Sequence, residues 1–133
     1  MNYIIGYPVA IVAIIFGLIL SVIAIPTTMI LHIFMVKNFL EYLQKNGRYF
    51  YQVGYSIDQT ANVILKYPAN LILIKKDGYL FGNSDETISS ALGKNKIWGT
   101  LAWGGCVLCK FLELIDPDHC IKAALDPTNN NGQ

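Results

Sequence analysis

Four residues near the C-terminus have the side chains that proteins use to hold zinc. They are Cys106, Cys109, His119 and Cys120, spaced as C-x2-C-x9-H-C. Three thiolates and an imidazole can give zinc its tetrahedral coordination. Cys106 and Cys109 lie in an apolar run, however, where a free cysteine behaves as a small hydrophobic side chain, and the adjacent His119 and Cys120 would project about 100° apart on a helix. We therefore expect buried structural thiols and no cofactor, with zinc as the alternative.

His119 and Cys120 could also form a thiol nucleophile and its base. Asp116 and Pro117 are expected to start a short helix as its N-cap and first residue, and a helix N-terminus stabilises a thiolate. Against this, the carboxylates of Asp116 and Asp118 repel a thiolate, and the cysteine and histidine of thiol enzymes are rarely adjacent in sequence. Catalysis by His119 and Cys120 is thus an alternative to a structural role.

A second group of polar residues is predicted to lie on neighbouring helices. Asp58 and Asn62 are four residues apart, so they share one face of a helix. The segment around Asp85 could bind a cation or offer a hydroxyl nucleophile, but its carboxylates and hydroxyls are also what helix capping requires. We predict a buried polar network that fixes how the helices meet. Its members are Asp58, Asn62, Asp85, Glu86, Ser89 and His119.

The elements that position these residues are predicted to be mainly α-helical. Residues 37–55 are rich in aromatic side chains and predict an amphipathic juxtamembrane helix, whose tyrosines suit either the lipid headgroups or the domain core. Ser56 and Gln59 have the spacing of a capping box, which predicts that a new helix starts there, and Pro68 is expected to end it. Residues 56–125 are expected to form one small helical domain, and residues 126–133 a disordered tail.

The pattern between residues 71 and 115 predicts the rest of this domain. Asp77 and Gly78 separate two short apolar runs, which favours a short β-hairpin or an extended loop. Asn83 is expected to cap the next helix and Gly93 to end it. A further helix, apolar almost all round, is predicted over residues 97–115. Its uncharged part is too short to cross a bilayer, so we expect it to be buried or to lie on the membrane.

The N-terminal residues 1–36 predict a transmembrane anchor. All Lys, Arg, Asp and Glu side chains lie between Lys37 and Asp126, and a bilayer core needs only about 20 apolar residues to cross. A cleavable signal peptide would have a basic start and a shorter apolar run. We expect one span, kinked near Pro26, in preference to a helical hairpin. Residues expected in the membrane include Ile4, Ile11, Ile15, Leu18, Val22 and Pro26.

The charged residues predict how the chain is oriented in the membrane and which classes of partner to expect. Lys37, Lys45 and Arg48 follow the apolar segment and no basic residue precedes it, so the C-terminal domain is expected in the cytoplasm, where thiols stay reduced. Ten basic residues balance nine acidic ones, which gives no electrostatic reason to expect a nucleic-acid partner. The expected partners are the lipid bilayer and either another protein or a second copy of the chain.

Two separated segments resemble a family of small uncharacterised bacteriophage and prophage proteins. They are FGNSDETISSALGKNK, at residues 81–96, and IDPDHCIKA, at residues 115–123; a D-Q-x-x-N helix like the one containing Asp58, Gln59 and Asn62 often precedes them in that family. The resemblance covers about half of the chain, residues 56–124. It implies a phage gene product and brings no settled activity or catalytic residues.

These observations favour a non-enzymatic, phage-encoded protein of the bacterial inner membrane or of a membrane-contacting layer of the virion. It would act as an anchored interaction module in virion structure and DNA delivery, in lysis or in excluding competing phages. One alternative is a membrane-tethered metal-binding or thiol-dependent enzyme that uses His119 and Cys120. Another is a holin-like protein in which residues 97–115 form a second membrane segment.

Overall fold

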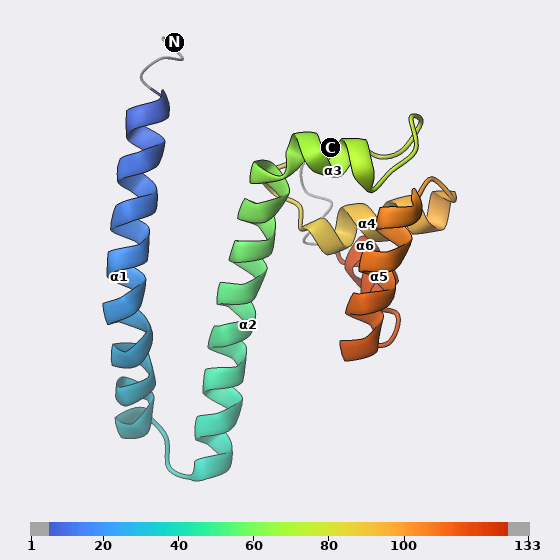
Figure 1. Cartoon of the computed structure of the whole chain (residues 1–133). Coiled ribbons are helices and arrows are strands. Elements are labelled where there is room, and N and C mark those ends of the chain that lie inside the picture. Colours follow the sequence, from blue (N-terminus) through green and yellow to red (C-terminus); the bar gives the residue numbers. More distant parts are fainter. Residues whose placement is uncertain (1–5, 128–133) are drawn as a thin grey trace. The chain divides into compact units, whose positions relative to one another are not determined.

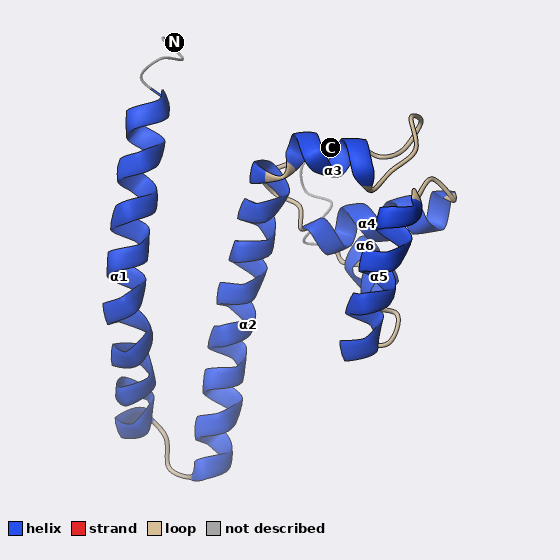
Figure 2. Ribbon diagram, in the orientation of Figure 1, coloured by secondary structure: helices blue, strands red, loops and turns tan. Residues whose placement is uncertain are grey.

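The computed structural model describes residues 6–127, and within them the protein is mainly α-helical (Figure 1; Figure 2). Its helices are α1 (Gly6–Met35), α2 (Phe39–Ile64), α3 (Lys66–Ile72), α4 (Ile88–Trp98), α5 (Trp103–Ile115) and α6 (His119–Leu125). The predicted fold class is therefore confirmed. The chain divides into two compact units, and the boundary between them, at Phe50 and Tyr51, falls inside α2.

In the N-terminal unit, α1 has the length and composition of a membrane span. It is 30 residues long with no buried residue, and it is apolar enough to cross a membrane. The hydroxyls of Ser21, Thr27 and Thr28 donate to carbonyls four residues earlier at 2.6, 2.7 and 2.8 Å, so these polar groups are satisfied within the helix. Pro26 lies inside α1 without ending it, whereas Ile4 lies outside the described residues.

The end of α1 contacts the start of α2 within the same unit. The Nδ1 atom of His32 and the Oδ1 atom of Asn46 are hydrogen-bonded at 2.7 Å. The His32 ring also meets Tyr49 edge to face, with ring centroids 6.2 Å apart. Asn46 is buried, although the residues around it on α2 are exposed or only partly covered. This contact helps to fix the turn that joins the two helices, together with hydrogen bonds that Glu41 makes to Lys37 and Asn38 within the turn.

α2 is one continuous helix, which corrects the helix start predicted at Ser56. The carbonyl of Ser56 accepts the Thr60 hydroxyl at 2.9 Å inside α2, so Ser56 caps nothing. A capping box is a local signal. It is overridden here because Asp58 and Asn62, on the last turns of α2, bind the chain that leads into α4.

The segment between α3 and α4 is an extended loop and not a hairpin. Pro68 does not end a helix but lies in the first turn of α3, where a missing N–H costs nothing. Ile74, which a hairpin would pair with the following run, forms an isolated antiparallel bridge with Leu101. Gly78 closes the turn by donating its N–H to the Lys75 carbonyl at 2.9 Å. Among the described residues, the short β-hairpin is therefore absent.

The predicted bounds of α4 and α5 are wrong. Thr87, and not Asn83, is the N-cap of α4, and its side chain accepts the Ser90 N–H at 3.1 Å. α4 ends at Trp98, and its C-cap is Gly99, whose φ of 71° places it in the left-handed region that glycine tolerates. The helix predicted over residues 97–115 is therefore broken, and α5 begins only at Trp103.

α6 also begins later than predicted. Asp116 is the C-cap of α5, and the N-cap of α6 is Asp118, whose φ of 60° is left-handed and whose side chain makes no capping hydrogen bond. His119 and Cys120 are consequently the first two residues of α6. Of the predicted tail, only Asp126 and Pro127 lie within the described residues.

Gly93, predicted to end α4, instead lies inside it and lets α6 approach. A Cβ atom at this position would lie 1.8 Å from the Cys120 carbonyl oxygen and 2.8 Å from the Ala124 methyl group. The backbones of α4 and α6 are therefore in close contact at Gly93, and together with α5 these helices enclose the core. The buried core residues are Ala69, Ile74, Phe81, Ala91, Leu92, Cys109 and Cys120.

We predict that Gly93→Ala destabilises the C-terminal unit by about 3 kcal/mol, because the added methyl group overpacks against backbone that cannot yield. Denaturant unfolding of the full chain in detergent, followed by tryptophan fluorescence, measures this because both tryptophans, Trp98 and Trp103, lie in that unit. Gly54→Ala is the matched control: a Cβ on Gly54 in α2 meets nothing within 4 Å, so this change should stabilise by about 0.5 to 1 kcal/mol. Equal effects of the two substitutions would contradict the close α4–α6 contact.

Candidate functional site

Asparagine side chains hold the extended segment that precedes α4. Asn62, fully buried on α2, donates from Nδ2 to the carbonyls of Asn83 at 3.1 Å and Glu86 at 2.8 Å. Its Oδ1 accepts the Gly82 N–H at 3.1 Å. Asn70 on α3 binds both backbone groups of Phe81, at 2.7 and 3.2 Å. These amides take the place of a neighbouring strand, because each offers a donor and an acceptor.

Asn95 on α4 completes this arrangement from the other side. Its Oδ1 accepts the Tyr79 N–H and its Nδ2 donates to the Tyr79 carbonyl, both at 2.8 Å. Nδ2 also donates to the Ala91 carbonyl, and Oδ1 accepts the Thr100 hydroxyl at 2.6 Å. Sequence reasoning missed Asn70 and Asn95, since an isolated asparagine carries no spacing signal that distinguishes a buried clamp from a surface residue.

Glu86 is a buried carboxylate with three partners. Its oxygens accept hydrogen bonds from the Tyr79 hydroxyl and the Ser90 hydroxyl, both at 2.7 Å, and pair with the Lys94 ammonium at 2.9 Å. Lys94 also lies 4.5 Å from the centre of the Tyr79 ring. A buried carboxylate is tolerated only when it is paired and hydrogen-bonded. Tyr79 and Lys94, which the predicted network did not include, supply two of these partners.

Burial and Glu86 together raise the pKa of the Tyr79 hydroxyl above its usual 10.0. Burial lowers the pKa of Lys94, but hydrogen bonds to Glu86 and Tyr79 outweigh this and leave the pKa above its usual 10.5. Both groups are therefore held in their protonated forms by the fold, as is expected beside a buried carboxylate.

Four residues form a hydrogen-bonded chain that joins α2, α4 and the start of α6. Asp58 accepts the Ile88 N–H at 3.1 Å and the Ser89 hydroxyl at 3.0 Å. Ser89 Oγ lies 3.3 Å from His119 Nε2, and His119 Nδ1 lies 3.1 Å from Asp116 Oδ2. Hydrogen bonds from Lys122 and then His119 lower the pKa of Asp116 below its usual value.

This chain of hydrogen bonds contains the residue types of a serine hydrolase triad. The position of the Ser89 hydroxyl proton nevertheless favours a structural role. In a triad the serine hydroxyl gives its proton to histidine. The single proton of Ser89 can go to Asp58 or to His119, and Asp58 is the nearer acceptor. The Asp58 carboxylate would also repel the oxyanion of an acyl-transfer reaction. Asp58, Ser89, Asp116 and His119 line a cavity of about 490 Å³ with Tyr51, Tyr55 and Leu112.

Asp85 differs from the other residues of the predicted network. It is exposed, and its backbone N–H donates to Asn83 Oδ1 at 3.1 Å. The carboxylate of Asp85 therefore does not take part in the buried hydrogen bonds described above. Asp58, Asn62, Glu86, Ser89 and His119 all do.

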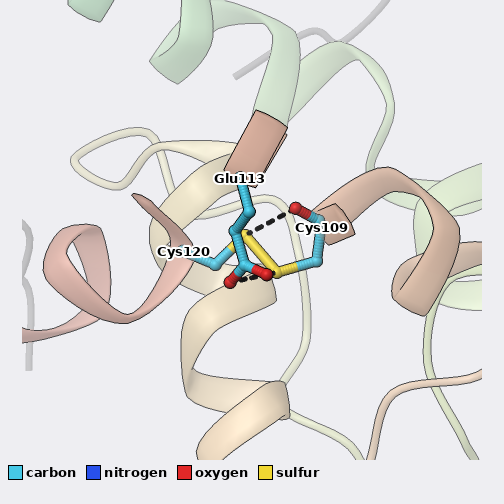
Figure 3. A group of neighbouring side chains, drawn as sticks. All are labelled: Cys109, Glu113 and Cys120. Atoms are coloured by element: carbon cyan, nitrogen blue, oxygen red, sulfur yellow. Dashed lines mark hydrogen bonds between the residues drawn. A yellow bond between two sulfur atoms is a disulfide. The ribbon is translucent and has the colours of Figure 1, made fainter. Parts of the chain in front are cut away.

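The cysteines form a disulfide and not a zinc site. Cys109 on α5 and Cys120 on α6 are bonded, with Cα atoms 6.2 Å apart (Figure 3). Glu113 lies beside them, 3.7 Å from Cys109 Sγ, and could join two thiolates around a metal only after reduction. Cys106 is free and exposed. The predicted buried free thiols are thus corrected, a metal site is not indicated, and Cys120 has no thiolate with which to act as a nucleophile.

In comparisons with known proteins, no family model, curated protein or solved structure matches the chain.

We predict that Asn62→Ala lowers the free energy of unfolding of the C-terminal unit by about 3 kcal/mol, because it leaves buried backbone groups of the loop without partners. Gln52→Ala, at an exposed position of the same helix, is the control and should change the stability by less than about 0.5 kcal/mol. Tryptophan fluorescence during denaturant unfolding measures both variants. A tolerated Asn62→Ala would mean that the loop does not depend on the amide.

We also predict that this unit loses stability as the pH rises above about 10. The pKa values of Tyr79 and Lys94 are raised in the folded protein, so the unfolded chain releases these protons first. The stabilisation is fully present below the usual pKa of 10.0 for tyrosine and disappears as the pH passes the folded values. Tyr79→Phe should make this decline shallower, and an unchanged slope in that variant would exclude Tyr79 as a source.

Proposed function

We propose that this protein is a non-enzymatic, phage-encoded inner-membrane protein in which α1 is the anchor and the C-terminal unit is an interaction module. One observation supports the proposal that α1 is a membrane anchor. Every residue from Gly6 to Ala24 is exposed, and nearly all of these residues are apolar. At 1.5 Å per residue this stretch is about 28 Å long, close to the roughly 30 Å of a bilayer core. Leaving it in water would cost about 1.5 to 3 kcal/mol for each large apolar side chain.

The state of the polar residues supports the non-enzymatic part of the proposal. Asp58 accepts hydrogen bonds from the first turn of α4, Glu86 is paired with Lys94, and Cys120 is in a disulfide. Groups that already have strong partners must lose them before they can act on a substrate. The holin-like alternative is disfavoured because α5 is only 13 residues long and buries Gly105 and Cys109 in the core.

Two features bear on which side of the membrane the C-terminal unit occupies. Lys37, Lys45 and Arg48 after the span favour the cytoplasm. The Cys109–Cys120 disulfide favours an oxidising compartment. We propose the cytoplasmic side, because the flanking charges act when the chain inserts, and because Cys109 and Cys120 are buried, which shields their disulfide from cytosolic reductants. Alkaline phosphatase fused after Gln133 should then be inactive, and an active fusion would place the unit in the periplasm.

The phage context is supported by the resemblance of residues 81–96 and 115–123 to phage and prophage proteins. Within that context the anchored unit acts in virion structure and DNA delivery, in lysis or in the exclusion of competing phages. A protein partner or a second copy of the chain, in addition to the bilayer, would complete the assembly.

We predict that the full-length protein stays in the membrane pellet of infected cells after carbonate extraction, because α1 is held by apolar contacts that alkali does not weaken. Mass spectrometry of purified particles and of the infected-cell membrane then distinguishes the roles. Many copies in the particle would favour virion structure or DNA delivery, and enrichment in the host membrane alone would favour lysis or exclusion. Release of the protein by carbonate would contradict the anchor.

A separate measurement tests the absence of catalysis. A fluorophosphonate reacts with activated serines by forming a phosphorus–oxygen bond and losing fluoride. The membrane-embedded protein should not be labelled by this reagent. Labelling that disappears in Ser89→Ala, while the thermal unfolding of the C-terminal unit stays unchanged, would favour a serine hydrolase built from Ser89, His119 and Asp116.

A further inference from the structure

α5 presents an apolar stripe to solvent, which we call the α5 stripe. Trp103, Val107, Phe111 and Leu114 recur at helical spacing, and they are 81%, 48%, 59% and 84% exposed. Val107, Phe111 and Leu114 line a shallow hollow on the surface. Contiguous apolar surface of this kind on a protein usually marks an interaction site.

A rotation of α5 about its axis could not bury the stripe. The opposite face of α5 already packs in the core, where it contributes Gly105, Leu108, Cys109 and Leu112. At Gly105 a Cβ atom would lie 2.2 Å from the Leu73 carbonyl oxygen, so no larger residue could replace it. Rotation of α5 would expose these residues and strain the Cys109–Cys120 bond. The outward position of the stripe is therefore fixed by the fold.

We propose that the α5 stripe docks on the surface of the same bilayer that α1 spans. This rests on the proposed function, since α1 then tethers the C-terminal unit to lipid within one chain. A tethered surface meets the membrane at high effective concentration, so even a short apolar stripe is enough. At the start of α5 the apolar surface continues onto α3: Gly104 lies against the Ile72 carbonyl, and Leu71 and Ile72 are exposed.

The side chains at the edge of the stripe fit an anionic lipid surface. Trp103, at the N-terminal end of α5, is the residue type that favours the headgroup boundary. Lys110 is exposed beside Val107 and Phe111, and a lysine can keep its stem on apolar surface while its ammonium reaches a phosphate. Glu113, which would be repelled by anionic lipid, is paired with Lys96.

The test places an environment-sensitive fluorophore on the stripe of the full-length protein. In a Cys106→Ser background, Leu114→Cys is labelled with nitrobenzoxadiazole, and Ser84→Cys, at an exposed loop position, is the matched control. Leu114 is the most exposed residue of the stripe, so its replacement should not disturb the fold. Both proteins are reconstituted into phosphatidylcholine–phosphatidylglycerol vesicles with and without nitroxide-labelled lipid.

We expect nitroxide lipid to quench the label at position 114 about threefold more than the label at position 84, because only the stripe touches acyl chains. Flotation of the protein with the vesicles reports on α1 separately, so a protein that does not float refutes the anchor itself. A floating protein with equal quenching at both positions would overturn the docking alone. So would a label at 114 that is shielded from water but not quenched by lipid, a result that would assign the stripe to a second copy or another protein.

Discussion

A partly buried extended segment without a neighbouring strand is the constraint on which the C-terminal unit depends. The chain from Tyr79 to Asn83 runs between helices and buries Phe81, so its backbone donors and acceptors need partners. Side-chain amides from α2, α3 and α4 supply them: Asn62, Asn70 and Asn95. Because each amide comes from a different helix, the segment ties the three helices together, which hydrophobic contacts alone would not do with the same specificity.

The extended segment also determines where the ionisable residues of this unit lie. The Tyr79 hydroxyl, placed by the extended segment, reaches Glu86, and Glu86 in turn draws in Lys94 and Ser90. Asp58 binds the first turn of α4, which brings Ser89 to His119. The polar groups that suggest chemistry in the sequence are therefore engaged in holding helices together.

Long apolar runs and helical periodicity predicted the type of structure correctly, whereas helix ends and tertiary contacts could not be predicted from local spacing. The long apolar helix α1 and the mainly helical fold follow from apolar runs and helical periodicity, and Asp58 and Asn62 share a face because of their spacing. In the sequence, Gly93 is equally compatible with a helix end and with a close contact between two helices. Only the position of Cys120, seen in the structure, decides between these alternatives. That same approach brings Cys109 and Cys120 together across 6.2 Å, so the disulfide could not be predicted before the packing of α6 was known.

The two apolar surfaces of the chain, α1 and one side of α5, differ in how much of each helix is exposed. α1 is exposed on all sides from Gly6 to Ala24, as a helix surrounded by lipid must be apolar on all sides. α5 is exposed on one side only, and its other side is joined to the core by Gly105 and by a disulfide. To cross the bilayer, α5 would have to leave that core, whereas lying at the interface requires no change in the fold. If the α5 stripe docks as proposed, the core packing that buries one side of α5 keeps its other side at the membrane surface.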